Sequence, residues 1–438
     1  MKKFVLLFLV LCVSLSLFGC NGMKSELIDY DEMVGGGGYY VEDAGGMIKI
    51  DGKPYGMIDA GVAGSFEGGG GNSHYERPAG LLTASAWDDN LHYSEWLDLF
   101  FVGQSEEENG KFANKYQKSG WGFNSLDRVT VKVVDKETQA SVSGATVISY
   151  NNFGAVTFTA RTNANGVAYL FPGTESGNIK VVSGEGAAET AFSSEERELA
   201  LDISGSKDKE NIIKLMFVVD VTGSMGDELS YLNNELIDIV KRVAASDKQT
   251  RIDLSLLFYR DHTDEVLFDY YDFLNVTDEQ NLQLQLKNIS KQRADGGGDY
   301  PEAVDEALAF ALNREWGEEN STRLIFHILD APSHESDENK ARYLNAVSLA
   351  AEKGVRICPV LCSSADELCE FLVRQEAVYT GGTFIYLTND SGYGNSHYDP
   401  ELPETTVEAL NDLVVRLING YHSGIFAEPV PWIKAEQQ

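Results

Sequence analysis

Residues 214–224 read KLMFVVDVTGS, and this stretch decides the fold of the C-terminal half of the chain. Its apolar run, residues 215–219, is typical of a parallel strand buried on both faces, since a strand with one solvated face alternates between apolar and polar side chains. An amphipathic helix is expected directly after it, because Leu229, Leu232 and Leu236 recur at helical spacing.

The same alternation of apolar strand and amphipathic helix continues towards the C-terminus. Such repeats predict an α/β fold over residues 212–422, a doubly wound and mostly parallel sheet with helices on both faces. In such sheets ligands bind beyond the carboxyl ends of the strands. Further strands are expected at 252–259, 324–329, 355–361 and 383–387, and helices at 278–290, 301–313, 338–353, 365–378 and 405–419.

Side chains with oxygen atoms follow these strands, so we expect them to converge at one edge of the sheet. Carboxylates and hydroxyls are hard ligands, suited to Mg²⁺, Mn²⁺ or Ca²⁺ rather than to zinc or copper. The candidate ligands are Asp220, Thr222 and Ser224 after the first strand, Asp299 and Glu302 in a glycine-rich loop before a helix, and Asp330 after a later strand.

These motifs resemble the von Willebrand factor A (VWA) family over residues 212–422. The stretch DVTGS at 220–224 resembles the metal-ion-dependent adhesion site, usually written D-x-S-x-S, with Thr222 in place of the first serine. The stretch DYPE at 299–302 is similar to the integrin β loop in which the glutamate completes the site, and Asp330 matches the family's later aspartate.

The resemblance implies a mechanism. Protein oxygens and water hold the metal ion and leave one coordination position open, which an acidic side chain of a partner protein fills. The ion inverts the local electrostatics, because the surrounding carboxylates alone would repel an acidic ligand. The alternative is a degenerate site in which Asp220 or Ser224 only caps a helix.

The N-terminus predicts a lipoprotein signal peptide over residues 1–19. Two lysines precede an apolar stretch at 4–18, which is short for a membrane span but typical of a signal sequence. The stretch LFGC at 17–20 resembles the bacterial lipobox, so Cys20 is expected to be acylated, with chains such as palmitate, and to anchor the protein at the outer membrane or cell surface. An uncleaved anchor with an incidental cysteine is the alternative.

The formal net charge of −33 argues against a nucleic-acid partner, because phosphate binding needs lysine and arginine. It also disfavours adsorption to anionic lipid and suits a protein outside the cytoplasm that meets cations or basic partners. The alternative is that the charge only maintains solubility.

The segments before the VWA-like half differ in composition. Residues 20–78 are rich in glycine and acidic residues and predict a tether, with a short hairpin strand near Met47. Residues 79–125 form an aromatic segment with helical spacing, which we expect to clamp onto a neighbouring domain; a sugar-stacking platform is the alternative. Residues 423–438 are expected to form a tail.

Residues 126–204 carry short alternating strands separated by turn residues, which predicts a small β-sandwich. The pattern resembles the carboxypeptidase regulatory-like domain. That resemblance implies no chemistry, so we interpret this region as a stalk or an interaction module.

Three cysteines remain beyond the signal region: Cys358, Cys362 and Cys369. We expect buried free thiols, with a Cys362–Cys369 disulfide as the alternative. A zinc site is less expected, because no histidine lies near them in sequence.

The sequence as a whole predicts a lipid-anchored adhesion or scaffold protein that is not an enzyme, since it contains no P-loop, no dinucleotide-binding motif and no HExxH motif. Two alternatives stay open. One is a metal-assisted hydrolase that uses Asp261, His262 or His334, and the other is a metal-free structural module.

Overall fold

The computed structural model describes residues 38–43, 46–48, 79–101, 110–113, 115, 119–298, 300–393 and 395–433. The chain divides into two compact units, Met1–Gly36 and Gly37–Gln438. The predictions for the signal peptide, Cys20 and Asp299 fall outside the described residues. Within the described part of the chain, no helix has the length and apolar character needed to cross a membrane.

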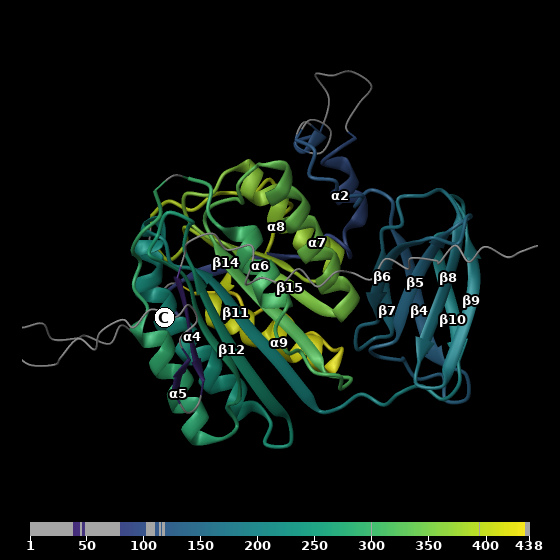
Figure 1. The fold of residues 1–438 in the computed structure, drawn as a ribbon, viewed down its shortest axis with the longest axis horizontal. Coiled ribbons are helices and arrows are strands. Elements are labelled where there is room, and N and C mark those ends of the chain that lie inside the picture. The colour runs from purple at the N-terminus through teal and green to yellow at the C-terminus, as the bar shows by residue number, and fades with distance from the viewer. Residues whose placement is uncertain are drawn as a thin grey trace, which may run out of the picture. The chain divides into compact units, whose positions relative to one another are not determined.

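A ten-stranded sheet dominates the second unit (Figure 1). Its centre is parallel, and each strand there is buried on both faces, as the apolar run at 215–219 predicts. The predicted α/β fold class is therefore confirmed. In sheet order, the parallel strands are β16 (Phe384–Thr388), β15 (Val355–Leu361), β14 (Thr322–Leu329), β11 (Ile212–Asp220) and β12 (Arg251–Tyr259).

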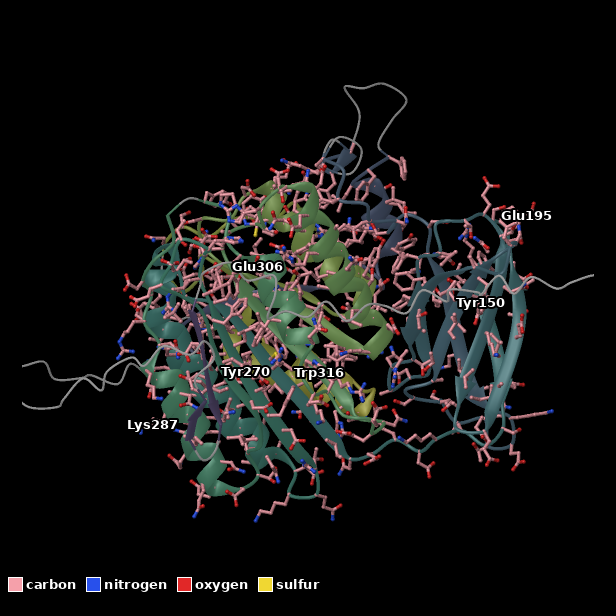
Figure 2. The ribbon with its side chains drawn as sticks, in the orientation of Figure 1. Tyr150, Glu195, Tyr270, Lys287, Glu306 and Trp316 are labelled. Atoms are coloured by element: carbon pink, nitrogen blue, oxygen red, sulfur yellow. The ribbon has the colours of Figure 1, made fainter. Side chains whose placement is uncertain are left out.

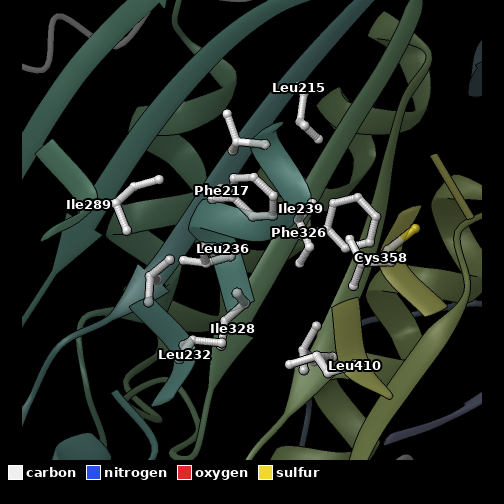
Figure 3. Close-up of a cluster of buried hydrophobic side chains, with 14 of the residues drawn as sticks. Leu215, Phe217, Leu232, Leu236, Ile239, Ile289, Phe326, Ile328, Cys358 and Leu410 are labelled. Atoms are coloured by element: carbon white, nitrogen blue, oxygen red, sulfur yellow. The ribbon is translucent and has the colours of Figure 1, made fainter. Parts of the chain in front are cut away.

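Helices cover both faces of this sheet (Figure 1). On one face, Leu232 and Leu236 pack with Phe217, Phe326 and Leu410 in a continuous core (Figure 3). Burying each such side chain contributes about 1.5–3 kcal/mol. The helices on this face are α4 (Gly226–Ser246), α5 (Glu279–Lys291) and α9 (Leu410–Ser423), and those on the other are α6 (Val304–Leu312), α7 (Asp337–Lys353) and α8 (Glu367–Thr380).

The edges of the sheet differ from the sequence-based expectation. The helical spacing within 79–125 predicts a helix, and this is wrong for Thr83–Trp87, which forms an antiparallel strand beside β16. The helix is confined to Tyr93–Asp98. Within the expected tether, the short hairpin strand predicted near Met47 is present at Gly46–Ile48, whereas its partner strand at Gly38–Asp43 was not predicted. The added elements are β3 (Thr83–Trp87), β17 (Glu408–Ala409), β13 (Val266–Asn275), β1 (Gly38–Asp43), β2 (Gly46–Ile48) and the helix α2 (Tyr93–Asp98).

Buried polar contacts attach residues 79–101 to the VWA-like half. The carboxylate of Glu235 on α4 accepts hydrogen bonds from the backbone N–H groups of residues 80–82, at 2.8–3.1 Å. Arg374 on α8 forms ion pairs with Asp89, at 2.5 Å, and with Glu370, at 3.0 Å. Trp96 is fully buried. The aromatic segment therefore acts as a clamp, and its three tryptophans, Trp87, Trp96 and Trp121, are buried and not available for sugar stacking.

Residues 129–203 form two further sheets, one of three strands and one of four. Buried and exposed residues alternate along β4 and β10, as expected for strands with one face on a core. The strands are β4 (Val129–Asp135), β7 (Val167–Leu170) and β10 (Glu198–Ile203) in one sheet, and β5 (Thr146–Asn151), β6 (Val156–Arg161), β8 (Gly177–Ser183) and β9 (Gly186–Phe192) in the other.

The three cysteines of the C-terminal half are free and buried, so the prediction of buried free thiols is confirmed. Burial raises the pKa of the Cys358 thiol to about 12 and that of the Cys362 and Cys369 thiols well above the ordinary value. Thiols held in this protonated state are poor metal ligands.

Candidate metal site

The candidate site lies where the order of the parallel sheet reverses. From β11 the chain adds β12 on one side and later β14 on the other, so the carboxyl ends of all three strands meet at one edge. Asp220 is in register with Tyr259, and the N–H of Val221 donates to the Tyr259 carbonyl at 3.0 Å. Such a reversal point is the usual ligand position in doubly wound sheets.

A chain of hydrogen bonds joins four of the predicted ligands. The backbone N–H and the hydroxyl of Thr222 donate to Asp220 Oδ1, at 2.8 and 2.7 Å. The Thr222 and Ser224 hydroxyls lie 3.2 Å apart, and the Ser224 hydroxyl donates to Asp330 Oδ1 at 3.0 Å. The structure thus brings together Asp220, Thr222, Ser224 and Asp330, which come from two strand ends.

The fifth predicted ligand, Glu302, follows a glycine-rich loop that packs against the first motif. Gly296 and Gly297 adopt φ of +79° and +72°, a conformation that favours glycine. A Cβ atom on Gly296 would lie 2.2 Å from the carboxylate of Asp264, so this close approach also requires glycine. The N–H of Gly223 donates to the Gly296 carbonyl at 3.1 Å, which holds the loop against the first motif.

Glu302 follows this loop and is fixed by its backbone. Its N–H donates to the Pro332 carbonyl at 3.0 Å, and it forms a parallel bridge with Ser333. A Cβ atom on Gly297 would lie 3.0 Å from Glu302 Oε1 and 3.3 Å from the Cβ of Thr222, so Glu302 and Thr222 both lie beside this glycine. The loop therefore places Glu302 beside the ligands after β11, whereas Asp299 lies outside the described residues.

The donor set fits a hard divalent cation. Asp220 is completely buried and Glu302 is 3% exposed, yet Asp220 Oδ2 and Glu302 Oε2 accept no hydrogen bond from any described residue. A buried carboxylate oxygen without a partner is costly, and a cation would compensate it. Ser224 is exposed, so the site is open to solvent on that side.

The carboxyls of this site are strongly perturbed. Burial, and after it the negative charge of Asp330, raises the pKa of Asp220 from its ordinary 3.8 to about 7. Burial, and after it the charges of Asp220 and Asp261, raises the pKa of Glu302 from 4.5 to about 9. Because these carboxylates destabilise one another, the site favours either protons or a metal ion.

These pKa shifts predict that the metal-free protein loses stability as the pH rises, whereas its affinity for a cation increases. Without one, the stabilisation from holding Asp220 and Glu302 protonated is complete below their ordinary pKa values and is lost as the pH rises through about 7 and about 9. Mg²⁺ must displace those protons, so its affinity is expected to rise from about pH 6 to pH 9. Calorimetry in buffers of different ionisation enthalpy measures the protons released, and a pH-independent affinity would contradict this expectation.

Ser333 adjoins His334 of the hydrolase alternative in the sequence, but the two side chains are not arranged as a nucleophile and its base. Ser333 is fully buried and its hydroxyl donates to Asp305 Oδ1 at 2.9 Å. His334 instead contacts Asp261 through Nε2, at 2.8 Å. Ser333 therefore supports the first turn of α6 and is not presented to a substrate.

Sequence reasoning missed a polar cluster at the same sheet edge. Ser363 Oγ lies 2.7 Å from His397 Nδ1, and the N–H of Ser363 donates to Glu228 Oε1 at 3.1 Å. Ser363 follows the end of β15, so its position after a buried strand was the available signal. All three side chains are buried, and the cluster ties α4 to the loop after β15.

The sequence has recognisable relatives. Residues 214–386 match the family model of the von Willebrand factor A domain. A protein named as a putative ariadne-like RING finger protein, from Acanthamoeba polyphaga mimivirus, is 26% identical over 233 residues, covering 50% of this chain and 22% of that protein. A protein named as an alpha-protein kinase, from Dictyostelium discoideum, is 29% identical over 130 residues, covering 28% of this chain and 19% of that protein. The chain thus spans about a fifth of the length of these relatives.

Solved structures also resemble the chain. The conserved hypothetical protein BatB of Bacteroides thetaiotaomicron has a TM-score of 0.30 at 14% identity, over 40% of this chain and 89% of that one. The pilus adhesin SpaC of Lactobacillus rhamnosus GG, in an open conformation, has a TM-score of 0.34 at 10% identity, over 57% of this chain and 32% of that one.

Proposed function

We propose that the von Willebrand factor A domain at residues 214–386 holds a divalent cation and uses it to bind an acidic side chain of a partner protein. The protein is then an adhesion or scaffold protein, and we propose no enzymatic activity for it. The observation that carries the proposal is a pair of buried oxygens, Asp220 Oδ2 and Glu302 Oε2, that accept no hydrogen bond from the described residues and lie near the exposed Ser224.

The proposed ligands are Asp220, Thr222, Ser224, Glu302 and Asp330, with Asp299 as a further ligand from the glycine-rich loop. Mg²⁺ is the expected ion, with Mn²⁺ or Ca²⁺ as substitutes, because every donor is a hard oxygen. When bound, the ion supplies positive charge at a surface that is otherwise strongly acidic. The buried side chains of Asp220 and Thr222 would contact the ion from the protein interior, and the partner's carboxylate would approach from the solvent-exposed side near Ser224.

We place this binding outside the cytoplasm, on a lipid-anchored protein. The proposal rests on the lipobox-like LFGC at 17–20, with Cys20 as the acylated residue. The net charge of −33 supports a surface that is held off anionic lipid and attracts cations. Metabolic labelling with a fatty acid, lost in Cys20→Ala, tests the anchor separately from the metal site.

The binding proposal is tested with the purified chain in two steps. Calorimetric titration of Mg²⁺ and Mn²⁺ is expected to show saturable binding that is lost in Asp220→Ala/Asp330→Ala. Capture of envelope proteins by the immobilised chain is then expected to require the cation and to be abolished by chelation and by Asp220→Ala. The exposed Asp390→Ala is the matched control. Capture of a partner that survives both chelation and Asp220→Ala would exclude the proposed mode.

A further inference from the structure

A second group of metal-ligating side chains lies near the first site. Asp261 follows β12 and is 1% exposed, while His262 and His334 are partly exposed. One ligand atom from each lies within 4.8 Å of the others. The three residues come from the turn between β12 and β13 and from the segment after β14.

The ligand atoms of this cluster lie close together around Asp261 Oδ1. Asp261 Oδ1 lies 2.8 Å from His334 Nε2 and 3.1 Å from His262 Nδ1. The two imidazole rings are 4.8 Å apart between centroids and are inclined by 73°. Two nitrogens and one carboxylate oxygen at this separation could supply three of the four donors of a tetrahedral zinc site.

An outer carboxylate orients one of the rings. His262 Nε2 lies 3.3 Å from Glu306 Oε1, and Glu306 is itself paired with Arg342 at 2.8 Å (Glu306 is labelled in Figure 2). Metal-bound histidines usually donate their second N–H to such a carboxylate. A metal ion on Nδ1, with the proton on Nε2, satisfies both ring nitrogens of His262.

We propose that Asp261, His262 and His334 form a second metal site, which takes a borderline transition-metal ion such as Zn²⁺. Its two nitrogen donors distinguish it from the all-oxygen site at Asp220, which suits a hard ion. The partial exposure of both histidines leaves the fourth coordination position to water or to an outside ligand. A metal ion bound by these residues would link the turn after β12 to the segment after Asp330. Both segments border the first site.

The proposal is tested by titrating Zn²⁺ into the full chain that carries Asp220→Asn. This background removes a ligand of the first site, so the outcome does not depend on the proposed function. One equivalent of Zn²⁺ is expected to bind and to raise the melting temperature. Co²⁺ in its place is expected to give the intense visible absorption of a tetrahedral complex.

Adding His262→Gln and His334→Gln is expected to weaken Zn²⁺ binding by a factor of about a hundred or more, beyond the roughly 10–100-fold effect of losing an outer partner. Glu306→Gln should lower the affinity within that smaller range and leave the stoichiometry and the Co²⁺ spectrum unchanged. His92→Gln, which removes a histidine elsewhere, is the matched control. No saturable Zn²⁺ binding in the Asp220→Asn chain, or equal binding after both histidine changes, would overturn the second site.

Discussion

Replacing Asp220 by asparagine is expected to weaken Mg²⁺ binding at least ~100-fold while making the metal-free protein more stable. The side chain is completely buried and its Oδ2 accepts no hydrogen bond from any described residue. Asparagine keeps the Oδ1 that accepts from Thr222 but removes the charge that opposes Asp330. Relief of that repulsion is expected to add ~1 kcal/mol or more to the unfolding free energy.

Both effects are measured on the same samples. Thermal or urea unfolding at pH 8 with EDTA reports the stability of the metal-free state, and calorimetry reports Mg²⁺ affinity. Asp390→Asn removes an exposed carboxylate and should change neither quantity appreciably. A variant that is less stable without metal would show that Asp220 has a structural role, and retained Mg²⁺ affinity would place the ion elsewhere.

Replacing Arg374 by methionine is expected to destabilise the protein by about 3–5 kcal/mol. Arg374 is 1% exposed and its guanidinium makes two contacts with Asp89, at 2.5 and 3.0 Å. Glu370 also pairs with Lys111, at 2.6 Å, and so keeps a partner after the change. Asp89 instead loses both contacts and is left as a buried charge.

Chemical denaturation followed by far-UV circular dichroism measures this loss. The double change Asp89→Leu/Arg374→Met is expected to recover most of it, because replacing a buried ion pair with apolar side chains is often neutral. Arg242→Met removes partly exposed pairs with Asp238 and Asp412 and should cost no more than about 1 kcal/mol. Equal losses for the two arginine variants would contradict the account of Arg374.

The central strands and the ends that carry the site were predictable because their signal is local. Residues 215–219 form a buried apolar run, and Asp220 ends that strand in the structure as the sequence indicates. Strand Val355–Leu361 has the predicted bounds. A strand covered on both faces requires apolar residues throughout, so its sequence alone identifies it.

The antiparallel strands outside the parallel centre depended on their pairing partners. Thr83–Trp87 reads TASAW, which has no long apolar run, and it is a strand because it pairs with Phe384–Thr388 about 300 residues later. Val266–Asn275 contains aspartates among aromatic residues, so its pairing with β12 was the deciding feature. Likewise, the sequence places His262 beside Asp261 and His334 at the same sheet edge, but only the fold brings His334 to Asp261.

The pairing of β3 has a consequence for domain architecture. The large sheet takes β3 from residues 83–87 and its parallel strands from residue 212 onward, so the two smaller sheets at 129–203 form an insertion within a discontinuous domain. Both ends of this insertion lead back to the large sheet, so it branches from that sheet and is not a spacer in series along the chain. A recombinant fragment starting at residue 214 would lose β3, expose the edge of β16 and leave Arg374 without Asp89.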